Sequence, residues 1–159
     1  MSVAFRRDGD EEHLEPRFEI PIPPGPNLVT ARGLALIGAQ VAELEARLAA
    51  LVAEGADEAS LKACKRDLRY WQTRQITAEV VPAPSGETVE IGTTVSFTLN
   101  GAPRTVSITG VDEADPASGR LAFSAPLARA LIGEEEGERI DFGGKDEAIA
   151  VLSIAVTPA

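Results

Sequence analysis

Hydrophobic positions in the first half of the chain recur at alternating spacings of three and four residues between Thr30 and Ala78. This is the heptad pattern of α-helices that pack against each other along an apolar seam. The seam is interrupted once, at residues 54–60, so the pattern predicts an antiparallel helical hairpin, a coiled coil, over residues 30–79. Thr30 is expected to cap the first helix, and Gly55 is expected to end it in a left-handed conformation. The predicted seam consists of Leu34, Ile37, Val41, Leu44, Leu48, Leu51, Leu61, Cys64, Leu68, Trp71 and Ala78.

Further along the chain the hydrophobic period changes to two, which is typical of half-buried β-strands. This alternation runs through residues 89–99, and the following Asn100-Gly101 predicts a tight hairpin turn. Pro126 opens a short helix between two later strands. We therefore predict an α+β fold, in which the helical hairpin is followed by a small antiparallel β-sheet domain of about five strands with one helix, over residues 89–159.

Prolines and glycines mark two segments whose composition cannot build a core. Residues 80–88 are predicted to be a linker, and residues 1–29 a flexible, acidic and proline-rich tail. The only histidine, His13, lies in this tail, and we expect it to be solvated rather than to bind a ligand. The acidic residues of the tail are Asp8, Asp10, Glu11, Glu12 and Glu15.

Composition restricts the classes of function. The formal net charge is −10 and the isoelectric point is about 4.6, which argues against a protein that grips nucleic acid directly through phosphate contacts. Nucleic acid is therefore expected only indirectly, through a partner. The single cysteine, Cys64, lies on the seam and is interpreted as a small core residue, which leaves no intrachain disulfide. The start of the chain has no apolar signal core and the sequence has no membrane-length run, so we expect a cytoplasmic protein that uses no membrane.

Charged side chains cluster at three places. Asp112, Glu113 and Asp115 could act as a metal or acid/base cluster, or could be a solvated loop. The predicted hairpin carries three acids around its turn and a basic group within two turns of its second helix, for which a solvated face with ion pairs is the simplest interpretation. These residues are Glu54, Asp57 and Glu58 at the turn, and Lys62, Lys65, Arg66 and Arg69 on the helix.

Two stretches carry a resemblance to a known family. Residues 112–142 read DEADPASGRLAFSAPLARALIGEEEGERIDF, and residues 30–48 read TARGLALIGAQVAELEARL. Together with the order of hairpin, linker and sheet domain, they resemble the bacterial GreA/GreB transcription elongation factors. The resemblance implies an FKBP-like carboxy-terminal domain that docks on RNA polymerase at the rim of its secondary channel, with the hairpin pointing inward. It also implies that the acids before Pro116 form a structured loop.

The resemblance further implies a role for the hairpin tip. Asp57 and Glu58, assisted by Glu54, would help to hold the second magnesium ion of the polymerase active site, so that the polymerase cleaves backtracked RNA by two-metal chemistry. The chain would then be no enzyme itself and would bind no cofactor alone. The tip departs from the family pattern, because its two acids are adjacent and therefore point about 100° apart on a helical turn. The hairpin is also short, since a helix from Thr30 to Glu54 spans roughly 37 Å.

The docking residues implied by the resemblance are Ser124, Pro126, Leu127 and Arg129. Family members usually have an aspartate and a serine before this proline, whereas this chain has Ser124 and Ala125. Because the seam is satisfied within one chain, we expect a monomer.

Four functions remain open at this point. Two share the docking hypothesis: stimulation of transcript cleavage by Asp57 and Glu58, and a non-cleaving regulator that competes for the channel or modulates elongation. A peptidyl-prolyl isomerase would need an aromatic pocket, and this domain offers only three phenylalanines, whose positions suit the core. An acidic adaptor that binds another partner is the fourth. The phenylalanines are Phe97, Phe123 and Phe142.

Overall fold

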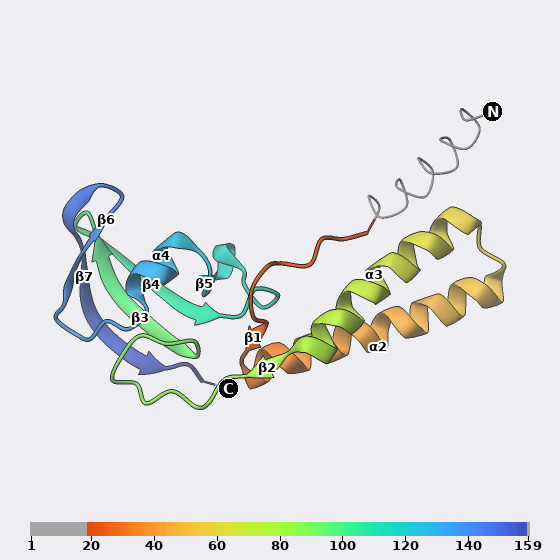
Figure 1. The fold of residues 1–159 in the computed structure, drawn as a ribbon, viewed down its shortest axis with the longest axis horizontal. Coiled ribbons are helices and arrows are strands. Elements are labelled where there is room, and N and C mark those ends of the chain that lie inside the picture. Colours follow the sequence, from red (N-terminus) through yellow and green to blue (C-terminus); the bar gives the residue numbers. More distant parts are fainter. Residues whose placement is uncertain (1–18, 159) are drawn as a thin grey trace, which may run out of the picture. The chain divides into compact units, whose positions relative to one another are not determined.

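The computed structural model describes residues 19–158, and its elements are drawn in Figure 1. The chain divides into two compact units. We call the first, which contains Ile37–Thr77 and the described residues before Pro26, the hairpin unit. The second, which contains Pro26–Leu36 and the chain from Ala78 on, is called the β unit. Residues 1–18 of the predicted tail, with His13, lie outside the described residues.

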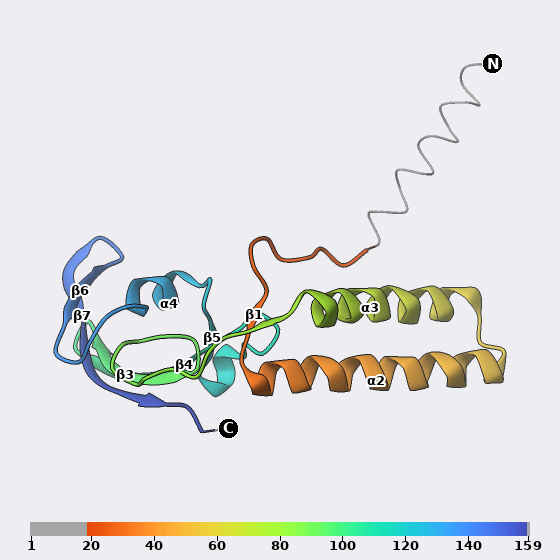
Figure 2. The same cartoon turned by 60° about the horizontal axis from the view of Figure 1, so that its bottom comes forward.

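The predicted helical hairpin is confirmed. Helix α2 spans Ala31–Glu54 and helix α3 spans Glu58–Thr77, and the two lie side by side (Figure 2). Four seam residues are buried between them and three more pack at the edge of this core. The Cys64 thiol donates a hydrogen bond to the Leu44 carbonyl at 3.7 Å, which agrees with its assignment as a core residue. The buried four are Val41, Leu44, Cys64 and Leu68, and the flanking three are Leu48, Leu51 and Trp71.

The last seam position was predicted wrongly. Ala78 lies just beyond the end of α3, and Arg74 is the buried residue of the last turn, with only 2% of its surface exposed. A long arginine stem can cover apolar surface as a leucine does, which a pattern of apolar residue types does not detect.

Both predicted helix signals at the ends of α2 are confirmed. The Gly33 amide donates to the Thr30 hydroxyl oxygen at 2.9 Å, which is an N-terminal cap. Gly55 has a φ of 68°, which a side chain would disfavour. The Ala56 amide bonds to the Leu51 carbonyl and the Gly55 amide to the Val52 carbonyl, so that the last carbonyls of α2 are satisfied in a Schellman motif.

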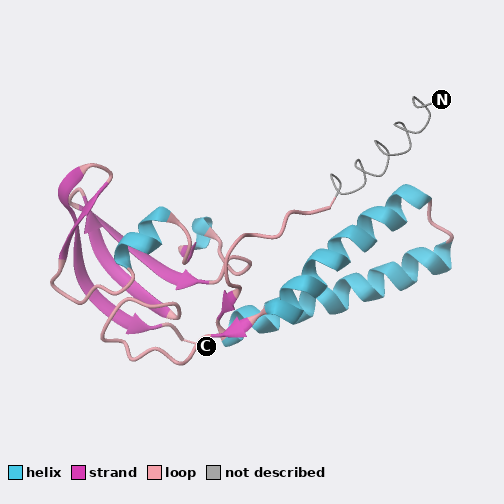
Figure 3. Ribbon diagram, viewed as in Figure 1, coloured by secondary structure: helices cyan, strands magenta, loops and turns pink. Residues whose placement is uncertain are grey.

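The β unit is built on the predicted five-stranded sheet, whose strands are magenta in Figure 3. Its strands are β3 (Thr93–Leu99), β4 (Ala102–Thr109), β5 (Arg120–Ala122), β6 (Arg139–Phe142) and β7 (Lys145–Val156), in the order β5-β4-β3-β7-β6. The predicted turn is present, since Asn100 and Gly101 both have positive φ. Helix α4 (Pro126–Leu131) buries Ala128 and Leu131 in the core of the sheet.

The sheet is mainly antiparallel, as predicted, with one parallel pair. Strand β5 pairs in parallel with β4, whereas the other three strand pairs are antiparallel. The reason is the connection between them: a 3₁₀ helix, η2 (Pro116–Ser118), and a left-handed Gly119 (φ 78°) turn the chain back beside β4 in the same direction. The Ser107 amide bonds to the Gly119 carbonyl at 2.8 Å, which fixes this return.

The predicted tail and linker are shorter than expected, because both contribute a strand to the β unit. Strand β1 (Leu28–Val29) pairs in parallel with strand β2 (Glu79–Val80), and Asn27 and Val29 are buried. Gly110 packs directly against β1, since a Cβ atom at this glycine would lie 2.5 Å from the Leu28 carbonyl oxygen. Residues 27–29 therefore belong to the β unit rather than to a tail.

A buried carboxylate fixes the first turn of α2 within the β unit. The Glu113 side chain is 5% exposed and accepts two hydrogen bonds, from the Thr30 hydroxyl at 2.6 Å and from Nη1 of Arg32 at 2.7 Å. Gly33 leaves room for it, because a Cβ atom there would lie 2.9 Å from Oε1 of Glu113. A buried carboxylate that keeps its charge needs such partners.

We predict that Gly33→Ala lowers the free energy of unfolding by about 1–2 kcal/mol, because the new methyl group would push a buried carboxylate away from its donors. Gly38→Ala is the matched control in the same helix. Its Cβ would lie 3.6 Å from Nε2 of Gln75, an ordinary contact, so this change should stabilise by about 0.5–1 kcal/mol through helix propensity. Urea unfolding of both variants measures the difference, and equal effects would show that the contact with Glu113 is dispensable.

Candidate functional site

The acids of the predicted hairpin tip lie at the turn between α2 and α3. Asp57 is the residue before α3 and accepts a hydrogen bond from the Ser60 amide at 3.3 Å. Glu58 is the first residue of α3, and its Oε1 lies 3.8 Å from Nζ of Lys62. Glu54 ends α2 and is exposed. Within residues 19–158, no group of three or more histidine, cysteine, aspartate or glutamate side chains could hold a metal ion.

Asp57 acts locally as a helix cap. The hydroxyl of Ser60, and then its backbone amide, hydrogen-bond the carboxylate and hold the pKa of Asp57 below its ordinary value of 3.8. The charge of Asp57 also lies at the positive end of the α3 dipole, which favours the ionised form. The sequence signal for this role was present, since aspartate three residues before serine at a helix start is typical of a cap.

The acids of residues 112–115 form a structured loop, not a metal cluster. Glu113 is engaged with the first turn of α2, as described above. Asp115 accepts a hydrogen bond from the Ser118 hydroxyl at 2.6 Å and lies 3.5 Å from Nη2 of Arg120. The hydrogen bond from Ser118 is the main cause that lowers the pKa of Asp115. The geometry of these contacts therefore supports the loop interpretation over acid/base chemistry.

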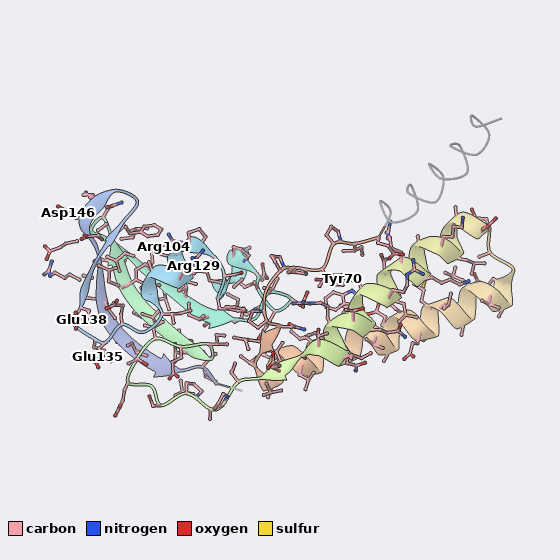
Figure 4. All side chains as sticks on the ribbon, viewed as in Figure 1. Tyr70, Arg104, Arg129, Glu135, Glu138 and Asp146 are labelled. Carbon is pink, nitrogen blue, oxygen red and sulfur yellow. The ribbon has the colours of Figure 1, made fainter. Side chains whose placement is uncertain are left out.

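Three of the four predicted docking residues are exposed in or just before helix α4. Pro126 occupies its first turn, where a missing amide hydrogen costs nothing, and Ala125 precedes it with no side-chain cap. Ser124, Pro126 and Arg129 are exposed, and Arg129 is labelled in Figure 4. Leu127, the fourth predicted residue, is half-buried and packs against the core of the sheet.

The three phenylalanines considered for a proline-binding pocket belong to the core. Phe97 is completely buried in β3, and Phe123 and Phe142 pack against the same cluster. A separate hollow of about 540 Å³ lies within the β unit, lined by residues 30–32, the linker residues 80–84 and parts of β4 and β7. Sequence patterns gave no sign of this hollow, because its walls come together only when β1 and β2 pair.

Comparison with known proteins places this β unit in a family. Residues 83–157 match the family model described as "Transcription elongation factor, GreA/GreB, C-term". The transcription elongation factor GreA of Desulfovibrio desulfuricans is 35% identical over 77 residues, which cover 46% of this chain and 48% of that protein. GreA of Mesorhizobium japonicum is 43% identical over 68 residues, which cover 40% and 43%.

Among solved structures, the GreA/GreB factor from Nitrosomonas europaea aligns with 83% of this chain and 99% of its own, at 17% identity and a TM-score of 0.39. The GreA factor homolog 1 (Gfh1) of Thermus thermophilus aligns with 82% and 99%, at 18% identity and a TM-score of 0.37.

The match lies within the β unit, and the relatives that share it are transcription elongation factors. Residues 83–157 are therefore similar to the C-terminal domain of the GreA/GreB factors. The chain spans about half the length of the relatives it matches. No helix among the described residues is long and apolar enough to cross a membrane.

The pKa of Asp57 gives a pH-dependent prediction. Because the folded-state pKa is lowered, the stabilising effect of the cap should be complete above pH 3.8 and should be lost as the pH falls below that value. An NMR titration of the Asp57 side chain should show a midpoint below 3.8 in the wild type, and a midpoint closer to 3.8 in Ser60→Ala. Asp57→Asn keeps a capping oxygen without a titratable group, so the protection of the first-turn amides of α3, measured relative to their intrinsic exchange rates, should change less with pH than in the wild type. A wild-type midpoint at or above 3.8 would contradict the capping role.

Proposed function

We propose that this protein regulates transcript elongation by docking on RNA polymerase through the surface of α4, with the helical hairpin entering the secondary channel. The observation that carries the proposal is the match of residues 83–157 to the GreA/GreB C-terminal domain, in which Ser124 before α4, and Pro126 and Arg129 within it, are exposed. In this proposal the polymerase is the partner, nucleic acid is contacted only through it, and the protein acts in the cytoplasm as a monomer.

The packing of α4 supports a docking role for its outer surface. Ala128 and Leu131 are completely buried and hold the short helix on the sheet. The exposed residues of the same element are then presented by a rigid base, which lowers the entropy cost of binding. Leu127 is half-buried, so its contribution would come from supporting the neighbouring residues rather than from contact with the partner.

The geometry of the hairpin tip favours a non-cleaving regulator over a cleavage factor. A divalent cation needs several oxygen ligands that converge on one point. At the tip, Asp57 is committed to Ser60 and Glu58 lies beside Lys62, and the two carboxylates are adjacent in sequence at the start of α3. These residues therefore do not fit a magnesium site of this chain, and helix α2, with 24 residues, spans only about 36 Å.

We predict that Arg129→Glu weakens binding to the cognate core RNA polymerase by roughly tenfold, about 1.4 kcal/mol, because it reverses a charge in the middle of the docking surface. Lys145→Glu makes the same change in charge at the exposed start of β7 and should leave the affinity within about twofold. Fluorescence anisotropy of labelled protein, titrated with polymerase, measures both. If Arg129→Glu binds as the wild type does, α4 is not the docking surface.

A transcript cleavage experiment separates the two mechanisms. The wild type and the double variant Asp57→Ala, Glu58→Ala are added to a stalled, backtracked elongation complex of the cognate polymerase. We expect the RNA to keep its length with both proteins, while both slow elongation or block an authentic GreA factor. Shortening of the RNA by the wild type but not by the double variant would identify a cleavage factor and overturn the non-cleaving mechanism.

A further inference from the structure

One face of α3 carries a concentrated positive charge on a protein that is strongly acidic overall. Four cations occur at spacings of three, one and three residues, which places them on the same side of a helix. We call this set the basic face. All four are at least partly exposed: the side-chain exposures are 72% for Lys62, 38% for Arg66 and 55% for Arg69, and Lys65 is exposed as well. The basic face therefore consists of Lys62, Lys65, Arg66 and Arg69.

The described acids neutralise this face only in part. Lys62 lies 3.8 Å from the carboxylate of Glu58, and Arg66 is paired with its neighbour Asp67 at 3.1 Å. Lys65 forms no ion pair with any residue from 19 to 158. Exposed pairs of this kind are weak, so the face keeps its attraction for further negative charge.

Glu19, the first described residue, lies against the basic face. Glu19 binds Arg69 with both carboxylate oxygens: Nε donates to Oε2 at 3.2 Å, and Nη2 donates to Oε1. A two-point contact between an arginine and a carboxylate fixes direction as well as distance. The contact joins residues 50 positions apart, so the segment before α2 is held against α3 within the hairpin unit.

Beside this contact lies a hollow of about 680 Å³, which extends from Glu19 toward the start of α3. Its floor is low because two of its lining residues are alanines, Ala59 and Ala63, and its walls are the four cations of the basic face. A hollow with a small apolar floor and cationic walls suits an extended chain that carries carboxylates.

An acidic run with the complementary charge lies a few residues before Glu19, with one cation, Arg17, between them. Residues 8–15 read DGDEEHLE, with five acids and no lysine or arginine. The length of the intervening chain is also suitable, since Glu15 and Glu19 are four positions apart and an extended chain spans about 13 Å over four positions. Lys62 and Arg69 are seven positions apart, which corresponds to about 10 Å along α3.

We propose that residues 8–15 dock in this hollow and cover the basic face of α3, with the pair Glu19–Arg69 as the fixed end of the docked segment. The basic face is then occupied by the chain's own carboxylates, and any other anionic ligand has to displace them. The inference concerns the hairpin unit alone and is independent of the proposed docking on polymerase.

Zero-length cross-linking of the full-length protein tests the proposal. A carbodiimide joins a carboxylate to a lysine amine only where the two are in contact. We expect cross-links from residues 8–15 to Lys62 or Lys65, mapped by mass spectrometry. Their yield should fall at least fivefold when NaCl is raised from 50 to 500 mM, because the Debye length shrinks to about 4 Å.

A double variant reverses two charges of the basic face while keeping the lysines and the carboxylates that the carbodiimide joins. Arg66→Glu with Arg69→Glu leaves Lys62, Lys65 and all the acids of residues 8–15 in place, and should lower the cross-link yield at least fivefold. Arg104→Glu with Arg139→Glu makes the same change in net charge at exposed positions of the sheet and should leave the yield unchanged. Circular dichroism of both variants checks that helix content is preserved.

Three results would overturn the proposal. The first is the absence of cross-links between residues 8–15 and α3 at 50 mM NaCl in the wild type. The second is an equal yield in the two double variants. The third is a yield that rises in proportion to protein concentration, because the occupant of the hollow would then be the segment of a second copy rather than of the same chain.

Discussion

The carboxylate of Glu113 is the interaction on which the β unit depends most. A buried, charged carboxylate is costly unless its oxygens are hydrogen-bonded, and here a hydroxyl and a guanidinium more than 80 residues away supply the bonds. The loop that carries Glu113 and the first turn of α2 that carries Thr30 and Arg32 must therefore form together. Gly33 is part of the same arrangement, because a side chain there would occupy the position of the carboxylate.

The β unit also contains α4, whose outer surface is the proposed docking surface. The loop of Glu113 continues through η2 into β5 and then into α4, so a single stretch of chain supplies the contact to α2 and the exposed residues Ser124, Pro126 and Arg129. The parallel pairing of β5 with β4 fixes this stretch on the sheet. The exposed residues of α4 and the contact to the first turn of α2 are thus carried by one stretch of chain within the β unit.

The parts of the fold that could be predicted have local signals, and the parts that could not depend on distant contacts. Heptad spacing, a capping threonine, a left-handed glycine and the Asn100-Gly101 turn each act within a few residues, so the sequence indicated them correctly. The two-residue strands β1 and β2 are too short to show a period. Arg74 and Glu113 are buried charged residues, and nothing in the local sequence distinguishes them from surface charges. In α4, six residues are too few to separate exposed Arg129 from half-buried Leu127 by periodicity.

At the hairpin tip, geometry rather than charge limits what the acids can do. The hydrogen bonds from Ser60 keep Asp57 ionised, and Glu58 is exposed at the start of α3, so negative charge is available at neutral pH. A carboxylate has two oxygens, and Asp57 could in principle use one for Ser60 and the other for a cation. Convergence is the missing element, because Asp57 bonds to the Ser60 amide whereas Glu58 lies beside Lys62. A tip whose acids serve the helix and its neighbouring lysine is better suited to fill a channel than to assemble a metal site.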